Sequence, residues 1–323
     1  MPLLSRRLFL KGAGGLAFGA TGLGSYAFGV EPGLVLEQTS YAITPPKWPA
    51  GLSLKIAIIA DIHACEPWMP VSRIRTICEL ANAMQPDLTV LLGDYNGGHN
   101  MVTRALEPQE WAEALEVLRA PLGVHAILGN HDWWHGAIPK MKGDHGESVR
   151  RALKAASVNV LENDAVRLKH QGQALWLLGL SDQLAIRIGR GRYRGMDDLA
   201  ATTGLIRDDA PAILLAHEPF IFSQVPDRVA ITLCGHTHGG QVNIPLIGAP
   251  FAEKRFGKDH VYGHVVEKGR HMLISAGLGT SIVPVRFMRP PEIVELTLGG
   301  AAIASAADRP ITERRLSPPA GRG

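Results

Sequence analysis

The chain has 323 residues, 46% of them hydrophobic, which is enough to bury the core of one large α/β domain or of two small ones. Lysine and arginine exceed aspartate and glutamate by 33 to 30, and the excess disappears when Arg6, Arg7 and Lys11 are set aside. Because the remainder is balanced, the composition excludes a partner held by bulk positive charge, and we expect no nucleic-acid partner.

Residues 1–29 are predicted to be a twin-arginine export signal. Residues 5–11 match the pattern S-R-R-x-F-L-K, and a Gly- and Ala-rich, weakly apolar stretch without acidic residues follows. An ordinary secretory signal and a retained membrane anchor are the alternatives, but the many glycines disfavour a stable membrane helix. We therefore expect an exported, periplasmic or extracytoplasmic protein that uses the twin-arginine machinery. An uncleaved signal would associate it with the membrane.

Residues 30–53 form a proline-containing lead-in, and regular structure is expected from Leu54. From there, short apolar runs end abruptly in polar residues. The runs are LKIAIIAD (54–61), LTVLLGD (88–94), GVHAILGN (123–130), AILLAH (212–217) and RVAITLCGH (228–236). Continuous runs of this kind are typical of strands that are buried on both faces of a sheet.

Helical and hairpin patterns separate these runs. Amphipathic helices are predicted at 72–84, 108–120 and 146–156, hairpins at 165–180 and 261–275, and a last strand at 292–298. The pattern predicts one domain over residues 54–298, an α/β fold with four layers in the order α/β/β/α and two mixed sheets flanked by helices. The tail 299–323, rich in Ala, Pro and Arg, is predicted to be disordered.

Three cysteines, Cys65, Cys78 and Cys234, are too few and too scattered for a disulfide framework. We expect them to be small buried residues rather than metal ligands.

Polar side chains at the ends of the apolar runs are the candidate site. In open α/β sheets, sites form at the carboxyl ends of the strands, so five strands can deliver these groups to one crevice. Asp61 and His63, like His236 and His238, are two residues apart, and on an extended segment each pair would project from one face. The set comprises Asp61, His63, Asp94, Asn130, His217, His236 and His238.

Carboxylate, amide and imidazole donors without a thiolate suit Mn, Fe, Zn or Co, and the set is too rich in imidazole for magnesium or calcium. Seven donors exceed the four to six that one metal takes, so a pair of metal ions sharing a carboxylate accounts for them better. Two such metals can hold a bridging hydroxide, clamp a phosphate and neutralise charge on the attacking and leaving oxygens. The residues therefore predict phosphoester hydrolysis.

The motifs resemble those of the calcineurin-like metallophosphoesterase superfamily. Its signature of five blocks, D-x-H, G-D, G-N-H-D/E, H and G-H-x-H, is present in order between Asp61 and His238. The resemblance implies a dinuclear metal centre and in-line attack of a metal-bridging hydroxide on phosphorus. It implies Asp61, His63 and His238 on the first metal, Asn130, His217 and His236 on the second, and Asp94 as the bridge.

The resemblance also assigns catalytic roles within the third block. His131 is implied as general acid or transition-state stabiliser beside the leaving oxygen, and Asp132 as the residue that orients its ring. For substrate contacts, His99 in the Gly-rich loop after Asp94 and Trp133 are candidates, although packing roles are the alternatives. Arg286 and Arg289 are interpreted as surface or core-rim residues rather than phosphate ligands.

The flanking segments resemble the exported or membrane-associated bacterial branch of the superfamily. Relatives there hydrolyse phosphodiesters at the cell envelope or cleave the pyrophosphate bond of UDP-diacylglucosamine. The alternatives to a soluble phosphoesterase are thus a lipid pyrophosphatase at the membrane surface and a non-catalytic metal-binding module. The stretch 184–203, rich in Arg and Gly, does not decide between them.

Overall fold

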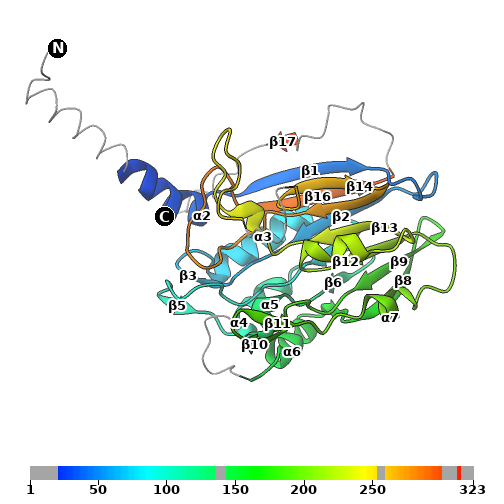
Figure 1. Cartoon of the computed structure of the whole chain (residues 1–323), viewed down its shortest axis with the longest axis horizontal. Coiled ribbons are helices and arrows are strands. Elements are labelled where there is room, and N and C mark those ends of the chain that lie inside the picture. The colour runs from blue at the N-terminus through cyan, green and yellow to red at the C-terminus, as the bar shows by residue number, and fades with distance from the viewer. Residues whose placement is uncertain (1–20, 135–142, 253–258, 300–310, 314–323) are drawn as a thin grey trace, which may run out of the picture.

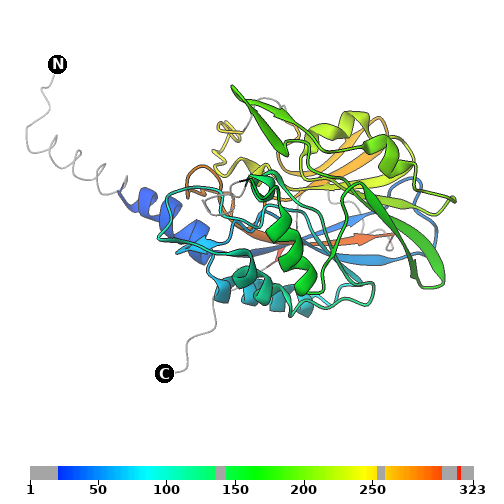
Figure 2. The same cartoon turned by 90° about the horizontal axis from the view of Figure 1, so that it is seen from below.

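The structure, a computed structural model, describes residues 21–134, 143–252, 259–299 and 311–313. Two mixed β-sheets pack face to face, and helices cover their outer faces (Figures 1 and 2). The predicted fold class is confirmed.

The first sheet combines a strand from the lead-in and the strands of the first βαβ units with two strands from the C-terminal part of the chain. Among the described residues it has seven strands in the order β17-β1-β16-β2-β4-β6-β7, and β2, β4, β6 and β7 run parallel. The bounds are β1 Glu37–Ile43, β2 Leu54–Ile59, β4 Leu88–Leu91, β6 Val124–Ala126, β7 Asn159–Val160, β16 Glu292–Leu298 and β17 Ile311–Glu313.

The second sheet is formed by the later part of the chain. Its order is β14-β15-β13-β12-β9-β8, in which β9, β12, β13 and β15 are parallel and the two outer strands close the predicted hairpins. The bounds are β8 Asp164–His170, β9 Gln173–Gly179, β12 Ala212–Leu215, β13 Val229–Cys234, β14 Gly263–Glu267 and β15 Arg270–Ile274.

The remaining strands are short. Two small two-stranded sheets pair β3 (Cys65–Glu66) with β5 (Arg104–Ala105), which are distant in sequence, and β10 (Ile186–Gly189) with β11 (Arg192–Arg194) in a hairpin. The helical elements are η1 Tyr26–Val30, α2 Glu31–Leu34, α3 Val71–Ala83, α4 Pro108–Leu115, α5 Asn130–Trp133, α6 Glu147–Ala155, α7 Leu199–Thr203, η3 Pro219–Gln224 and η4 His238–Gly240.

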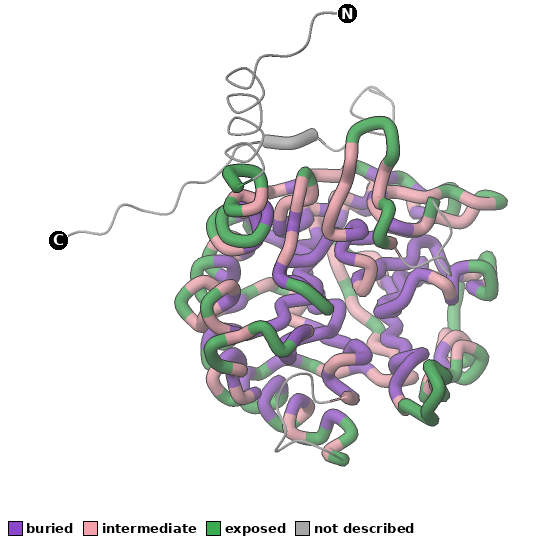
Figure 3. The backbone as a smooth tube through the Cα atoms, turned by 60° about the vertical axis from the view of Figure 1, so that its left-hand side comes forward, coloured by how far each residue is buried: buried purple, intermediate pink, exposed green. Residues whose placement is uncertain are grey.

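Both faces of the central strands are buried, as the continuous apolar runs predict. On β2, Leu54, Ile56 and Ile58 join the core between the sheets, whereas Ala57 and Ile59 join the core beneath the helices. Buried segments fill the interior of the body and exposed ones lie around it (Figure 3). The three cysteines are buried and unbonded, which confirms their predicted packing role.

The helix predicted at 108–120 ends earlier than expected. Helix α4 stops at Leu115, and Leu118 forms a turn back to it while remaining buried. Pro121 follows, and a proline disfavours helical backbone at the residue before it. The helix begins with a capping box between Glu107 and Glu110.

Regular structure begins before Leu54. Strand β1 pairs in parallel with β16 over all of its residues, so the lead-in supplies a strand of the first sheet and regular structure begins earlier than the expected Leu54. Strand β17 pairs with β1, in contrast to the prediction of a wholly disordered tail. The rest of the tail beyond Gly299 and residues 1–20 of the predicted signal lie outside the described residues.

Residues 21–34 are helical and lie at one end of the body (Figure 1). The Glu31 carboxylate accepts the backbone N–H groups of Met288 and Arg289 at 3.0 and 2.7 Å, which ties α2 to the segment before β16. Within the described residues, no helix is both long and apolar enough to span a bilayer.

A buried carboxylate on β16 gives a stability prediction. Glu292 accepts hydrogen bonds from the hydroxyls of Thr39, Tyr262 and Ser275 and from the N–H of Ala276. Glu292→Leu should therefore lower the free energy of unfolding by about 3 kcal/mol or more, because buried donors lose their acceptor. Urea denaturation measures the change.

The matched control is Glu295→Leu on the same strand. Its carboxylate is partly exposed and lies 3.9 Å from Lys55 Nζ, so the loss should be about 1 kcal/mol or less. Equal destabilisation by the two substitutions would contradict a special role for Glu292.

Candidate metal centre

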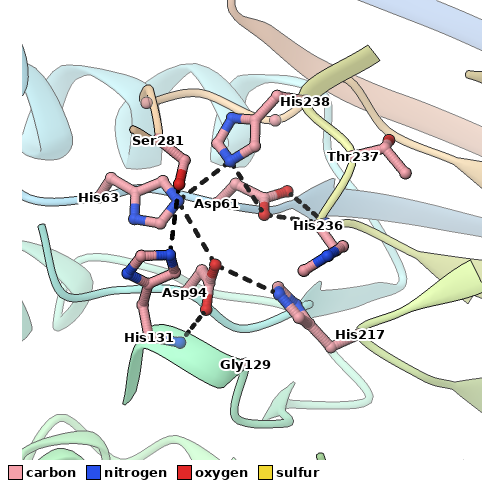
Figure 4. A network of polar contacts seen from close by, with 12 residues as sticks. Asp61, His63, Asp94, Gly129, His131, His217, His236, Thr237, His238 and Ser281 are labelled. Carbon is pink, nitrogen blue, oxygen red and sulfur yellow. Dashed lines mark hydrogen bonds and ion pairs between the residues drawn. The ribbon is translucent and has the colours of Figure 1, made fainter. Parts of the chain in front are cut away.

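The seven predicted ligands lie close together at the carboxyl ends of strands from both sheets, and Figure 4 labels all of them except Asn130, which contacts His236. The loop after β2 carries Asp61 and His63, and the loops after β4, β12 and β13 carry the next groups. Asn130 is the first residue of α5, directly after β6. The ligand set is Asp61, His63, Asp94, Asn130, His217, His236 and His238.

Asp61, His63 and His238 form the first group. One potential ligand atom from each lies within 4.8 Å of the others, and all three side chains are buried. The Nε2 atoms of His63 and His238 are 3.1 Å apart, and His238 Nε2 is 3.7 Å from Asp61 Oδ1.

Asp94, His217 and His236 form the second group, again with ligand atoms within 4.8 Å of one another. His217 Nε2 lies 3.3 Å from Asp94 Oδ2. Asn130 belongs with this group, because its Oδ1 is 2.8 Å from His236 Nδ1.

The Asp94 carboxylate faces both groups. Its Oδ2 lies 3.4 Å from His63 Nε2 and 3.3 Å from His217 Nε2. The position is the one a carboxylate shared by two metals would need.

The ring nitrogens fit bound cations. His63 Nδ1 and His217 Nδ1 contact the backbone carbonyls of Asn96 and Leu92 at 2.8 and 2.6 Å. A carbonyl only accepts, so these nitrogens carry the proton and each Nε2 offers a lone pair to the centre. His217 Nε2 is buried and faces Asp94 Oδ2 at 3.3 Å, so the two side chains offer a nitrogen and an oxygen donor to one metal ion.

The charges in the crevice are strongly perturbed. Burial raises the pKa of Asp61 to about 7. Burial also opposes the charge of Asp94, but attraction to His217 outweighs it and lowers the pKa of Asp94 well below its usual value. Two carboxylates with such different surroundings are typical of a functional site.

The backbone at the ligands is left-handed, not extended. The φ angles of Asp61, His63, Asp94, His236 and His238 are 53°, 46°, 57°, 68° and 51°. The expectation that strand alternation aims each pair is therefore wrong. Each such residue costs about 1–3 kcal/mol, which packing and hydrogen bonds elsewhere must offset.

Two glycines allow the loops to approach the ligands. A Cβ on Gly129 would lie 2.4 Å from Asp94 Oδ1, and one on Gly235 would lie 2.7 Å from Asp61 Oδ2. A side chain at either position would displace the neighbouring carboxylate.

His131 lies beside the two groups. Its backbone N–H donates to Asp94 Oδ1 at 2.8 Å, and its ring is 4.9 Å from that of His63 and 3.3 Å through Nε2 from the Ser281 hydroxyl. Burial lowers the pKa of His131 to about 3, with His63 and Arg187 among the further causes. The ring is thus neutral at neutral pH.

Asp132 does not orient the His131 ring. One of its oxygens accepts the N–H groups of Asp94 and Gly129, and the other accepts those of Tyr95 and Asn96. Among the described residues, no side chain or backbone group forms a hydrogen bond with His131 Nδ1. The expected orienting role is wrong, because the carboxylate is turned inward to hold the loop after β4.

The predicted substrate contacts are largely buried. Trp133 is 8% exposed and belongs to the core beneath the helices, so it has the packing role that was the alternative to substrate contact. Trp134 instead lies beside His131, with the two rings 5.4 Å apart, because neighbouring helical residues point in different directions. His99 is 5% exposed and contacts Thr280 Oγ1 at 3.1 Å.

Arg286 is fully buried and does not face the crevice as a phosphate ligand. Its guanidinium donates to carbonyls that include those of Ala276, Gly279 and Arg289, and Nη2 lies 3.4 Å from His238 Nδ1. Burial lowers its pKa to about 10, so it stays charged at neutral pH. It positions the segment that carries Ser281.

Sequence reasoning missed two buried carboxylates beside the second group. Asp182 and Glu218 each offer an atom within 4.8 Å of a ligand atom of His217, and Glu218 Oε1 lies 4.0 Å from His236 Nδ1. The two side chains form a hydrogen bond with each other, and burial together with the neighbouring Glu218 raises the pKa of Asp182 well above its usual value. The signal was present, because Asp182 ends the apolar run LWLLGLSD as Asp61 and Asp94 end theirs.

The sequence matches known phosphoesterases. The family model for calcineurin-like phosphoesterases matches residues 54–267. The chain is 32% identical over 308 residues to the uncharacterized metallophosphoesterase YkuE of Bacillus subtilis, covering 92% of this chain and 99% of that protein. It is 29% identical over 297 residues to the phosphodiesterase YaeI of Escherichia coli, covering 92% of this chain and 100% of that protein.

Gly129→Ala should disturb the second group without changing any ligand. The new Cβ would collide with Asp94 Oδ1 and, at 2.6 Å, with His217 Cε1. We expect metal binding to weaken at least about tenfold, because displaced ligands lose their geometry. Isothermal titration with Mn²⁺ measures it. Gly29→Ala, with no atom within 4 Å of the added Cβ, is the control and should bind as wild type does.

Glu218→Gln should weaken Mn²⁺ binding by about 10-fold, because the carboxylate adds negative charge beside His217 and His236. Glu110→Gln, which removes an exposed carboxylate paired with Arg104, is the matched control. Unchanged affinity in Glu218→Gln would show that this carboxylate does not act on the metal centre.

Proposed function

This chain belongs to the calcineurin-like phosphoesterase family and is a phosphoester hydrolase, and from that premise we propose that it is a dinuclear metal-dependent phosphodiesterase. One observation carries the proposal. The Asp94 carboxylate lies within 3.4 Å of ring nitrogens from both buried ligand groups. A shared carboxylate between two sets of imidazole and oxygen donors suits a pair of transition metals such as Mn, Fe, Zn or Co.

We assign the ligands by the two groups. Asp61, His63 and His238 would hold one metal, and Asn130, His217 and His236 the other, with Asp94 shared. When bound, the two metals would neutralise phosphate charge and make a water molecule nucleophilic at neutral pH.

His131 would stabilise the leaving oxygen. Its backbone is fixed to Asp94, and its neutral ring stands between His63 and Trp134, so a ring N–H can donate to an oxygen that gains negative charge. The Ser281 hydroxyl holds the ring from its Nε2 side. An adjacent anionic phosphate favours the protonated imidazole, which can then give a proton to the leaving group.

Asp132 is proposed as a positioning residue. Its four backbone hydrogen bonds hold Asp94 and the following loop, so it acts on the reaction through Asp94. All four bonds come from backbone N–H groups, so through them the carboxylate contacts no ligand side chain directly.

We also propose that the enzyme is exported by the twin-arginine machinery and works outside the cytoplasm, where an uncleaved N-terminal segment would retain it at the membrane. The pattern at residues 5–11 supports this. Cleavage of UDP-diacylglucosamine is the alternative activity, and an external location argues against it, since that nucleotide substrate is made inside the cell.

The test combines metal analysis with a substrate panel. We expect purified wild type to hold two metals and to hydrolyse bis(p-nitrophenyl) phosphate faster than p-nitrophenyl phosphate or a UDP-lipid, and chelation to abolish the activity. His131→Ala should retain both metals and lose at least about 100-fold in kcat, because it removes only transition-state stabilisation.

Asp94→Ala supplies the complementary result. Without the shared carboxylate, the chain should hold fewer than two metals. Two metals retained in this variant would contradict the bridging assignment, and a fully active His131→Ala would contradict the role of the ring. Preference for the UDP-lipid would favour the pyrophosphatase.

A further inference from the structure

The β10–β11 hairpin is strongly basic and lies next to the helix that carries His131 (Figure 1). Its sequence IRIGRGRYR, residues 186–194, contains no acidic residue. It carries Arg187, Arg190, Arg192 and Arg194, and all four side chains are exposed. Within the described part of the chain, no carboxylate forms an ion pair with any of them. Asp198, which follows the hairpin, caps α7 instead.

Trp134 fixes the hairpin in place. Its ring lies 5.4 Å from His131, stacks on Tyr193 at 5.1 Å, and has the Arg187 guanidinium 3.8 Å from its centroid. Its indole N–H donates to the carbonyl of Leu184 at 2.9 Å, where the chain enters the hairpin. The same side chain therefore contacts both His131 and the hairpin, which holds the basic strand pair at a set place beside the reacting centre.

The position of the hairpin determines which half of the substrate it could contact. His131 is the residue assigned to the leaving oxygen, and Trp134 and the hairpin lie next beyond it. The portion of the substrate attached to the leaving oxygen would extend toward that side. Exposed arginines without carboxylate partners attract anions, and the guanidinium fork suits phosphate oxygens.

We propose that the β10–β11 hairpin recognises a second anionic group on the leaving half of the substrate, so that the substrate class is a phosphodiester whose leaving group bears a phosphate. The proposal rests on the proposed function. Water attacks the scissile phosphorus, the bond to the leaving oxygen breaks, and that oxygen takes a proton. The leaving half departs with its own phosphate held near the arginines. The near-balanced charge of the rest of the chain limits this attraction to the hairpin.

Glycerophosphoglycerol and its terminal monophosphate provide the test, because they contain the same scissile diester. The monophosphate yields two molecules of glycerol phosphate when the phosphorylated half leaves, and glycerol plus glycerol bisphosphate when the other half leaves. We expect wild type to cleave the monophosphate at least about 10-fold faster in kcat/KM, and to give two glycerol phosphates.

The variant Arg190→Ser/Arg192→Ser/Arg194→Ser removes three charges and keeps Arg187 on Trp134. It should lose about 10-fold in kcat/KM on the monophosphate, lose the product preference, and change less than about twofold on glycerophosphoglycerol, which lacks the second phosphate. The control, Arg75→Ser/Arg119→Ser/Arg207→Ser, removes three exposed arginines from other elements and should leave both substrates and the product ratio unchanged.

Each of the other possible outcomes would contradict one part of the proposal. An equal loss on both substrates, or no loss on either, would overturn recognition by the hairpin. Products of glycerol and glycerol bisphosphate would place the anion on the other half. Failure of metal-loaded wild type to cleave either diester would overturn the proposed function itself, and the hairpin proposal with it.

Discussion

The crevice depends on one buried carboxylate that lies between two sets of imidazoles. Asp94 contacts His63 and His217 through one oxygen and the backbone of His131 through the other. A buried charge needs partners on every side, so the loops that supply them must meet at this point. Asp132 holds the loop of Asp94, and Gly129 leaves room for it.

A second set of contacts holds the segment between β15 and β16 beside the two ligand groups. Arg286 binds the carbonyls of the segment between β15 and β16, and this segment brings Ser281 to His131. Glu292 of β16 accepts the N–H of Ala276 near the start of this segment, and Glu31 of α2 accepts the N–H of Arg289 near its end. The residues around the N-terminal helix and the metal centre are therefore parts of one packed structure.

The side chains of α5 and of Trp134, which follows it, point in two directions. Asn130, His131 and Trp134 face the reacting side, whereas Asp132 and Trp133 are turned into the protein. One helical turn thus supplies a candidate metal ligand, the ring that we assign to the leaving oxygen and the side chain that contacts the basic hairpin. The same turn also supplies the carboxylate that holds the neighbouring loop.

The sequence by itself determined the layered α/β fold and the seven residues at the strand ends. Continuous apolar runs report burial on both faces, and parallel strands necessarily bring their carboxyl ends to one edge. Those signals are local, so LKIAIIAD or RVAITLCGH can be read without knowing its neighbours.

Only the tertiary structure decided how the side chains are aimed. The left-handed backbone at Asp61 and His238, the inward turn of Asp132 and the docking of the hairpin on Trp134 all depend on contacts between distant segments. The same is true of β1, whose pairing with β16 joins residues more than 250 positions apart. Such long-range contacts outweigh local preference because packing and buried hydrogen bonds contribute more than the conformational propensity of a single residue.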